Sequence, residues 1–263
     1  MPKDAKESRH PPQLSVIMPV YNEAGTVLAS LERVLATGLD MEVIVVDDGS
    51  TDGTAEGLAG VDDTRVRVLR EPANRGKGWA VRRGIALSKG EAVIVQDADL
   101  EYDPHDFRIL LDAMRGEGVS VVYGNRLHPG NPRCSHRRYL WGGMLVTMVA
   151  NMLYGAGLHD EPVCYKLFEG RLLRSINLRS VGFEFCPEVT AIVRRLGYRI
   201  AERPVRYEPR TIRQGKKIRW TDGVLALWTL LKCRFVTKRS LTKRPERAQG
   251  RSDGAPADGA KTG

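Results

Sequence analysis

The chain contains 263 residues, of which 42% are hydrophobic and 28% charged, a composition that suits one large α/β domain with short tails. Part of its net charge of +9 lies in residues 236–263, which hold seven basic and three acidic residues. Charge alone therefore argues only weakly for nucleic acid, and it fits an anionic membrane surface or phosphate ligands equally well. The four cysteines have no CxxC or zinc spacing, which favours reduced thiols in a cytosolic protein.

Neither a secretory leader nor a membrane-spanning helix is expected. Residues 1–12 lack an apolar segment, and an uncharged run at Gly142–Leu158 is shorter than the roughly 20 residues that cross a bilayer. We expect residues 1–12 to be disordered, residues 13–235 to form the folded domain, and residues 236–263 to be a disordered basic tail.

Short apolar runs alternate with helical patterns through the first half of the chain. The expected strands are Leu14–Met18, Glu42–Val46, Arg65–Leu69, Ala92–Gln96 and Val119–Tyr123, and the expected helices are Ala24–Ala36, Gly78–Ser88 and Pro104–Arg115. Asp103 is the expected N-cap of the third helix, and Gly116 its expected end. Strands that alternate with helices predict a mostly parallel sheet with helices on both faces.

The pattern changes after Tyr123. A basic segment leads into a mostly apolar helix at Tyr139–Tyr154, and a short α/β stretch follows to about Val205. A basic loop at Arg210–Arg219 then precedes an amphipathic helix at Thr221–Phe235. An apolar helix behind a basic segment is typical of an interfacial helix at lipid headgroups, and a plain core or dimer helix is the alternative.

Acidic residues gather where three of the expected strands end. Asp97 and Asp99 are two residues apart, which in an extended segment puts both carboxylates on one side, and Glu101 continues that side. Ligands bind beyond the carboxyl ends of such strands, and paired carboxylates suit Mg²⁺ or Mn²⁺. A solvated acidic turn is the alternative.

Four motifs in order identify a family. Pro-Val-Tyr-Asn-Glu (19–23), Asp-Asp-Gly-Ser-x-Asp-Gly-Thr (47–54), Asn-Arg-Gly-Lys-Gly-x-Ala (74–80) and Asp-Ala-Asp (97–99) each lie at a strand end or a helix start. This order resembles the family 2 glycosyltransferases with the GT-A fold, a Rossmann-like, mostly parallel α/β sheet. The resemblance covers about Leu14 to Phe235.

Motifs in the second half narrow the resemblance. Gly-Asn-Arg (124–126), Asp-x-x-x-Cys-Tyr-Lys-x-Phe (160–168), Phe-x-Phe-x-x-Glu (183–188) and the Arg210–Trp220 segment look like the dolichol- or polyprenyl-phosphate sugar synthase branch. This branch transfers a hexose from a GDP- or UDP-sugar to a polyprenyl phosphate. The resemblance therefore implies a peripheral enzyme on the cytoplasmic face of a membrane, with mannose as the favoured sugar.

The resemblance also implies roles for individual residues. Base and ribose would be held by Pro19, Tyr21, Glu23 and Asp48, with Lys77 near the nucleotide. The metal, Mg²⁺ or Mn²⁺, would be held by Asp97, Asp99 and Glu101; the branch often has Gln at the third position, so Glu101 is a departure. The phosphates would be gripped by Arg126 and Arg210, whose planar guanidinium groups suit phosphate oxygens.

Two rival functions remain at this point. The first is a family 2 transferase acting on a saccharide or another soluble acceptor, which would need a general base, and Glu188 or Asp160 would be the candidates. The second is a non-catalytic protein that binds nucleic acid. The low aromatic content of 6% argues against that rival, and we expect no nucleic-acid partner. The oligomeric state is not indicated.

Overall fold

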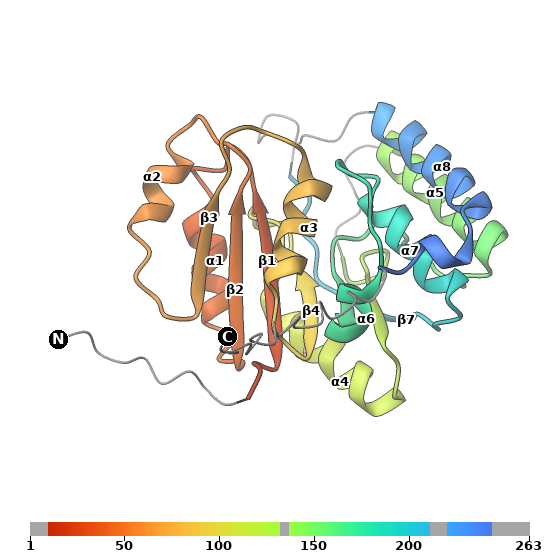
Figure 1. Cartoon of the computed structure of the whole chain (residues 1–263), viewed down its shortest axis with the longest axis horizontal. Helices are drawn as coiled ribbons and strands as arrows, with labels where there is room; N and C mark the ends of the chain where they lie inside the picture. Colours follow the sequence, from red (N-terminus) through yellow and green to blue (C-terminus); the bar gives the residue numbers. More distant parts are fainter. Residues whose placement is uncertain (1–9, 132–136, 211–219, 244–263) are drawn as a thin grey trace, which may run out of the picture.

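A seven-stranded sheet forms the centre of the computed structural model, which describes residues 10–131, 137–210 and 220–243 (Figure 1). The strand order is β3-β2-β1-β4-β6-β5-β7. The strands are β1 (Leu14–Val20), β2 (Met41–Asp47), β3 (Val66–Arg70), β4 (Ala92–Val95), β5 (Val121–Asn125), β6 (Lys166–Glu169) and β7 (Ala201–Pro204). All neighbours pair in parallel except β6, which is antiparallel to both β4 and β5.

The central strands are mainly apolar because helices cover both faces of the sheet. In β1 Leu14 pairs with Met41 of β2 and with Ala92 of β4, and all three side chains are buried. Strands buried on both faces read as continuous apolar runs rather than alternating ones. The predicted mostly parallel α/β fold is therefore confirmed.

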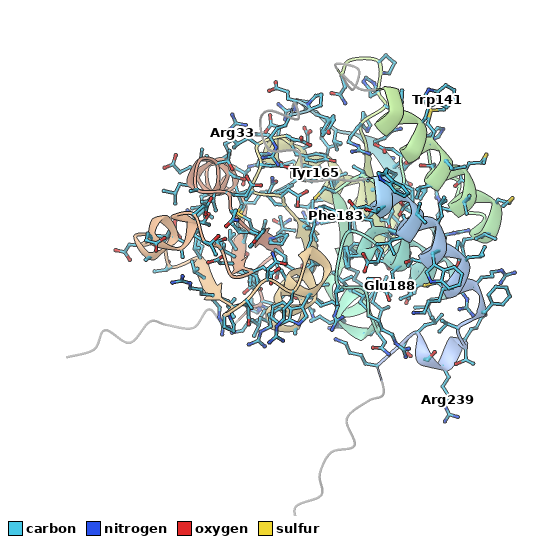
Figure 2. The ribbon with its side chains drawn as sticks, turned by 90° about the horizontal axis from the view of Figure 1, so that it is seen from above. Arg33, Trp141, Tyr165, Phe183, Glu188 and Arg239 are labelled. Atoms are coloured by element: carbon cyan, nitrogen blue, oxygen red, sulfur yellow. The ribbon has the colours of Figure 1, made fainter. Side chains whose placement is uncertain are left out.

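The helices of the first half flank the sheet. They are α1 (Val27–Leu35), α2 (Thr54–Ala59), α3 (Lys77–Leu87) and α4 (Phe107–Glu117), with a short 3-10 turn, η1 (Pro104–Asp106), before α4. Figures 1 and 2 show α1 and α3 on opposite faces of the sheet. Asp103 caps η1 as expected, but α4 runs past Gly116 and ends before Gly118, whose φ of 60° favours glycine. The sequence patterns did not predict α2.

A second layer follows β5. It contains α5 (Arg137–Tyr154), α7 (Phe185–Arg195) and α8 (Trp220–Phe235), while α6 (Gly170–Ser175) packs against β4, β6 and α3. Figure 1 shows α5 and α8 side by side at the end of the molecule farthest from β3, with α7 beneath them. A small apolar cluster that includes Val146, Ala191 and Leu230 joins the three helices. Among the helices that the structure describes, none has both the length and the apolar character of a membrane span.

The folded chain continues beyond Phe235, where the sequence analysis placed the start of a disordered tail. A 3-10 turn, η3 (Lys238–Ser240), is followed by Leu241, which is 2% exposed and belongs to the main core. Thr242 forms a β-bridge with Ile176. The expected boundary is therefore corrected to at least residue 243, while residues 1–9 and 244–263 lie outside the described part of the chain.

Candidate active site

The carboxyl ends of β1, β2 and β4 meet at one edge of the sheet, and three polar loops follow them. Two of these loops are tied to each other by the backbone and side chain of Asn22, which has a φ of 51°. Its N–H donates to Ser50 Oγ at 2.9 Å, and its Oδ1 accepts from Thr51 N at 2.8 Å. The N–H of Glu23 donates to Thr54 Oγ1 at 2.9 Å, and the Oε2 of Glu23 lies 3.2 Å from Arg210 Nη1.

Asp97 lies in the loop after β4 and pairs with Lys77, the first residue of α3. Lys77 Nζ is 2.6 Å from Asp97 Oδ1 and 2.7 Å from Oδ2. Burial acts to raise the pKa of Asp97, but the ammonium group of Lys77 outweighs it and the pKa is lowered. Burial likewise opposes the charge of Lys77, yet Asp97 raises its pKa above the usual value. Both groups are therefore charged, and Lys77 neutralises one of the predicted metal ligands.

Arg210 gathers the other acidic side chains. Its guanidinium lies 2.9 Å from Asp99 Oδ2, 3.2 Å from Glu23 Oε2 and 3.6 Å from Glu101 Oε1. Its backbone N–H also donates to Glu101 Oε1 at 2.9 Å, and the hydroxyl of Tyr207 donates to Glu101 Oε2 at 2.9 Å. We call Glu23, Asp97, Asp99 and Glu101 the acidic cluster. One arginine thus holds three of its four carboxylates, which come from two strand ends.

The acidic cluster fits a divalent cation by charge and by ligand type. Four carboxylates face two cationic side chains, Lys77 and Arg210, and a cation of charge +2 would balance the excess. Burial, and after it the neighbouring charges of Asp97 and Glu101, raises the pKa of Asp99 to about 7. Carboxylate oxygens are the ligands that Mg²⁺ and Mn²⁺ prefer.

The carboxylates do not yet form a chelating set. Among the described residues, no three acidic, histidine or cysteine side chains converge as metal ligands. The expected extended segment is also absent, because β4 ends at Val95, Asp97 lies beyond the strand and Asp99 lies in the turn that follows. Lys77 is paired with Asp97, and Arg210 with Glu23, Asp99 and Glu101, so a metal that used these carboxylates as ligands would compete with the two cations.

Asp48 has a structural contact that the sequence did not reveal. Its carboxylate accepts the N–H groups of Arg75, at 3.0 Å and 3.1 Å, and of Gly76, at 2.7 Å. Burial nevertheless raises its pKa above the usual value. Gly76 has a φ of 102°, and a Cβ there would lie 2.4 Å from Val181 O, so glycine is required. Asp48 therefore fixes the loop that presents Lys77. The base and ribose roles predicted for Asp48, Pro19 and Tyr21 stay predictions.

Arg126 follows β5 and is paired with Asp160. Its Nε and Nη2 lie 2.8 Å and 2.7 Å from the two oxygens of Asp160, and its backbone N–H also donates to Oδ2 at 2.8 Å. Burial acts to raise the pKa of Asp160, but Arg126 outweighs it and the pKa is lowered. The Arg126 guanidinium lies 5.2 Å from the centre of the Tyr207 ring. Tyr207, which the sequence analysis missed, therefore connects Arg126 to the acidic cluster.

Neither residue considered as a general base is suited to that role. Asp160 is held by Arg126, with a lowered pKa that makes it a weak base. Glu188 is buried, and its carboxylate accepts the N–H groups of Arg179 and Ser180 at 2.9 Å. Each carboxylate thus holds a neighbouring segment in place. The part of the basic loop at 211–219 lies outside the described residues.

Comparison with known proteins identifies the family. The model of Glycosyl transferase family 2 matches residues 15–173. The chain belongs to glycosyltransferase family 2. The acidic cluster, Lys77 and Arg126 fall within the matched range, and Arg210 follows it. The chain is therefore a glycosyltransferase.

Three similar proteins illustrate the likeness. The hexosyltransferase Agl6 of low-salt glycan biosynthesis in Haloferax volcanii is 31% identical, and the match covers 76% of this chain but only 48% of that protein. The polyprenol monophosphomannose synthase of Mycolicibacterium smegmatis is 31% identical, and the match covers 81% of this chain and 85% of that protein. A solved structure of glucosyl-3-phosphoglycerate synthase from Mycobacterium tuberculosis, in complex with Mn²⁺, UDP and product, shares the fold with a TM-score of 0.66. Its identity is 21%, and the match covers 86% of this chain and 81% of that one.

Proposed function

We propose that this glycosyltransferase moves a hexose, with mannose favoured, from a GDP- or UDP-sugar to a polyprenyl phosphate at a membrane surface, with Mg²⁺ or Mn²⁺ and with inversion. The acidic cluster carries the proposal, because its excess of carboxylates over cationic side chains at the carboxyl edge of the sheet suits a divalent metal, which would neutralise charge on a diphosphate. The similar polyprenol monophosphomannose synthase supports the acceptor and the sugar.

The chain's own residues would bind and align the two substrates. Asp97, Asp99 and Glu101 would hold the metal, which supplies neutralisation of the departing diphosphate. Arg210 and Arg126 would hold phosphate oxygens, as guanidinium groups do in bidentate pairs. Lys77 would stay beside Asp97, near the diphosphate.

A phosphate acceptor explains why the site needs no general base. The second pKa of a phosphate monoester is roughly 6, so the acceptor is largely dianionic near neutral pH and attacks without losing a proton. A sugar hydroxyl would need a base, and Asp160 and Glu188 are both held by strong hydrogen bonds. Positioning of the acceptor oxygen in line with the leaving diphosphate would then account for most of the rate enhancement.

A donor screen tests the proposal. Purified protein with Mn²⁺ and a short polyprenyl phosphate would receive GDP-mannose, UDP-glucose or UDP-N-acetylglucosamine, and release of the nucleoside diphosphate would be recorded. We expect one donor to be turned over only when lipid and metal are both present, and Asp99→Ala to be inactive. Turnover that needs a saccharide in place of the lipid would instead establish the soluble-acceptor reading, and unchanged turnover by Asp99→Ala would refute the metal assignment.

A further inference from the structure

The loop after β4, which carries Asp97 and Asp99, contains a strained residue. Leu100 has a φ of 64°, in the left-handed region, where the Cβ of an L-residue crowds the following carbonyl oxygen. Among the non-glycine residues that the structure describes, only Asn22 shares a positive φ, and leucine lacks the polar side chain with which asparagine stabilises this conformation. A costly backbone conformation persists only where surrounding contacts hold it, and such residues gather at functional sites.

The start of this loop is held by Tyr165, which directly precedes β6. The antiparallel register of β4 and β6 pairs Ile94 with Leu167, and continuing it by two residues places Tyr165 opposite Gln96. The Tyr165 hydroxyl donates to Gln96 Oε1 at 2.6 Å, and Gln96 Nε2 donates to the carbonyl oxygen of Asp97 at 2.7 Å. The orientation of the amide is thereby fixed, because the Asp97 carbonyl can only accept. Tyr165 and Gln96 are both buried, so no water competes for these bonds.

The end of the loop is held by the same segment. Cys164 donates its backbone N–H to the Tyr102 hydroxyl at 3.1 Å, and the rings of Tyr102 and Tyr165 stack with their centres 4.5 Å apart. Burial raises the pKa of Tyr165 well above its usual value, so its hydroxyl keeps the proton that it donates. Residues 164 and 165, in the interior of the molecule (Figure 2), therefore hold the loop on both sides of the strained Leu100.

We infer that Tyr165 is a positioning residue for the acidic cluster: through Gln96 it fixes the Asp97 carbonyl and keeps the loop in the strained form that presents Asp97 and Asp99. This rests on the proposed function, which gives these carboxylates a metal to bind. Without the hydroxyl, the buried oxygen of Gln96 loses its donor, and Leu100 can relax toward a negative φ. Relaxation would move Asp99 relative to Asp97, and carboxylates that are no longer held in place bind a metal more weakly.

Mn²⁺ binding to Tyr165→Phe tests this role against a purely structural one. Tyr123→Phe is the matched control, because Tyr123 is equally buried and its hydroxyl lies 2.9 Å from Thr190 Oγ1, joining β5 to α7 instead of the loop. Each variant loses one buried hydrogen bond, so each should lower Tm by about 2–4 °C. Electron paramagnetic resonance of the free ion would give the Mn²⁺ affinity without donor or acceptor. We expect Tyr165→Phe to bind Mn²⁺ about tenfold more weakly, and Tyr123→Phe to bind as wild type does.

A glycine at position 100 should rescue the weakened binding. Glycine adopts a positive φ without strain, so the loop would depend less on the contacts of Tyr165. The double variant Tyr165→Phe with Leu100→Gly should therefore bind Mn²⁺ several-fold more tightly than Tyr165→Phe alone. A double variant that binds no more tightly would overturn the part assigned to strain at Leu100.

The outcomes separate this inference from the proposed function. Wild-type affinity in Tyr165→Phe, or equal weakening in Tyr123→Phe, would overturn the inference and leave the metal assignment intact. Wild-type protein that binds no Mn²⁺ would overturn the metal assignment together with the inference. Mn²⁺ binding in the predicted order, without any lipid-dependent turnover, would support the inference and refute the proposed acceptor alone.

Discussion

Replacing Arg210 by alanine tests how the acidic cluster is held. The arginine contacts Asp99, Glu23 and Glu101, and its side chain is 17% exposed, so its removal leaves three carboxylates with no neighbouring guanidinium. Breaking a largely buried ion pair by removing one partner costs about 3 kcal/mol of unfolding free energy. For a domain of this size, that loss lowers Tm by about 6–12 °C. Millimolar Mg²⁺ or Mn²⁺ should restore most of the loss, because the metal replaces the missing positive charge.

Thermal unfolding with and without the metal provides the measurement. Arg65→Ala is the control, because Arg65 pairs with Asp63 on an exposed turn, where such pairs contribute about 0–1 kcal/mol. We expect Arg65→Ala to unfold within about 3 °C of wild type and to show no additional response to the metal. The reasoning is refuted if Arg210→Ala unfolds at the wild-type temperature in metal-free buffer, or if the metal stabilises it no more than it stabilises wild type.

Three further predictions follow from the same contacts. Asp99→Asn should lower turnover about a thousandfold in a steady-state assay without lowering Tm, because burial and the charges of Asp97 and Glu101 raise the pKa of this half-buried carboxyl to about 7 despite its pairing with Arg210; wild-type turnover would contradict the prediction. Burial acts to raise the pKa of Asp160, but Arg126 outweighs it and holds the pKa below the usual value. The ion pair therefore stabilises the fold fully above about pH 4, and this stabilisation is lost as the pH falls through the lowered pKa. Asp160→Asn should therefore lose about 3 kcal/mol at pH 7 and less at pH 3, measured by urea unfolding, whereas equal losses at both pH values would argue against the linkage. Leu241→Ala should cost about 2–4 kcal/mol in the same assay, and no loss would mean that the folded domain ends before residue 241.

The sequence predicted the parallel part of the fold because its signals are local. The strands β1, β2 and β4 are built mainly from short apolar runs, and the loops that follow them carry the family motifs. The rule that ligands bind at the carboxyl ends of such strands then placed the acidic residues together. The sequence predicts strand β6 less clearly, because the strand begins with a lysine, Lys166. This side chain is buried, and it contacts Glu161 and the ring of Tyr123.

The ion pairs of the site could not be predicted from the same patterns. Arg210 is far from Glu23 and Asp99 in the chain, and nothing in the local sequence shows that the segment after β7 returns to the loop after β4. The bridge between Tyr102 and Tyr207 brings the two segments together. The folded end of the chain was missed for a similar reason, because Leu241 is a single apolar residue among basic and polar neighbours, and its burial is purely tertiary.

The most direct test of the central claim is transfer of labelled mannose from GDP-mannose into a butanol-extractable, acid-labile product. The reaction would contain Mn²⁺ and either a polyprenyl phosphate, the corresponding polyprenol, or a mannose oligosaccharide. The account predicts labelled lipid only with the polyprenyl phosphate, since the polyprenol lacks the dianionic nucleophile and Asp160 and Glu188 are not available as bases. Labelled oligosaccharide, or equal transfer to the polyprenol, would contradict it.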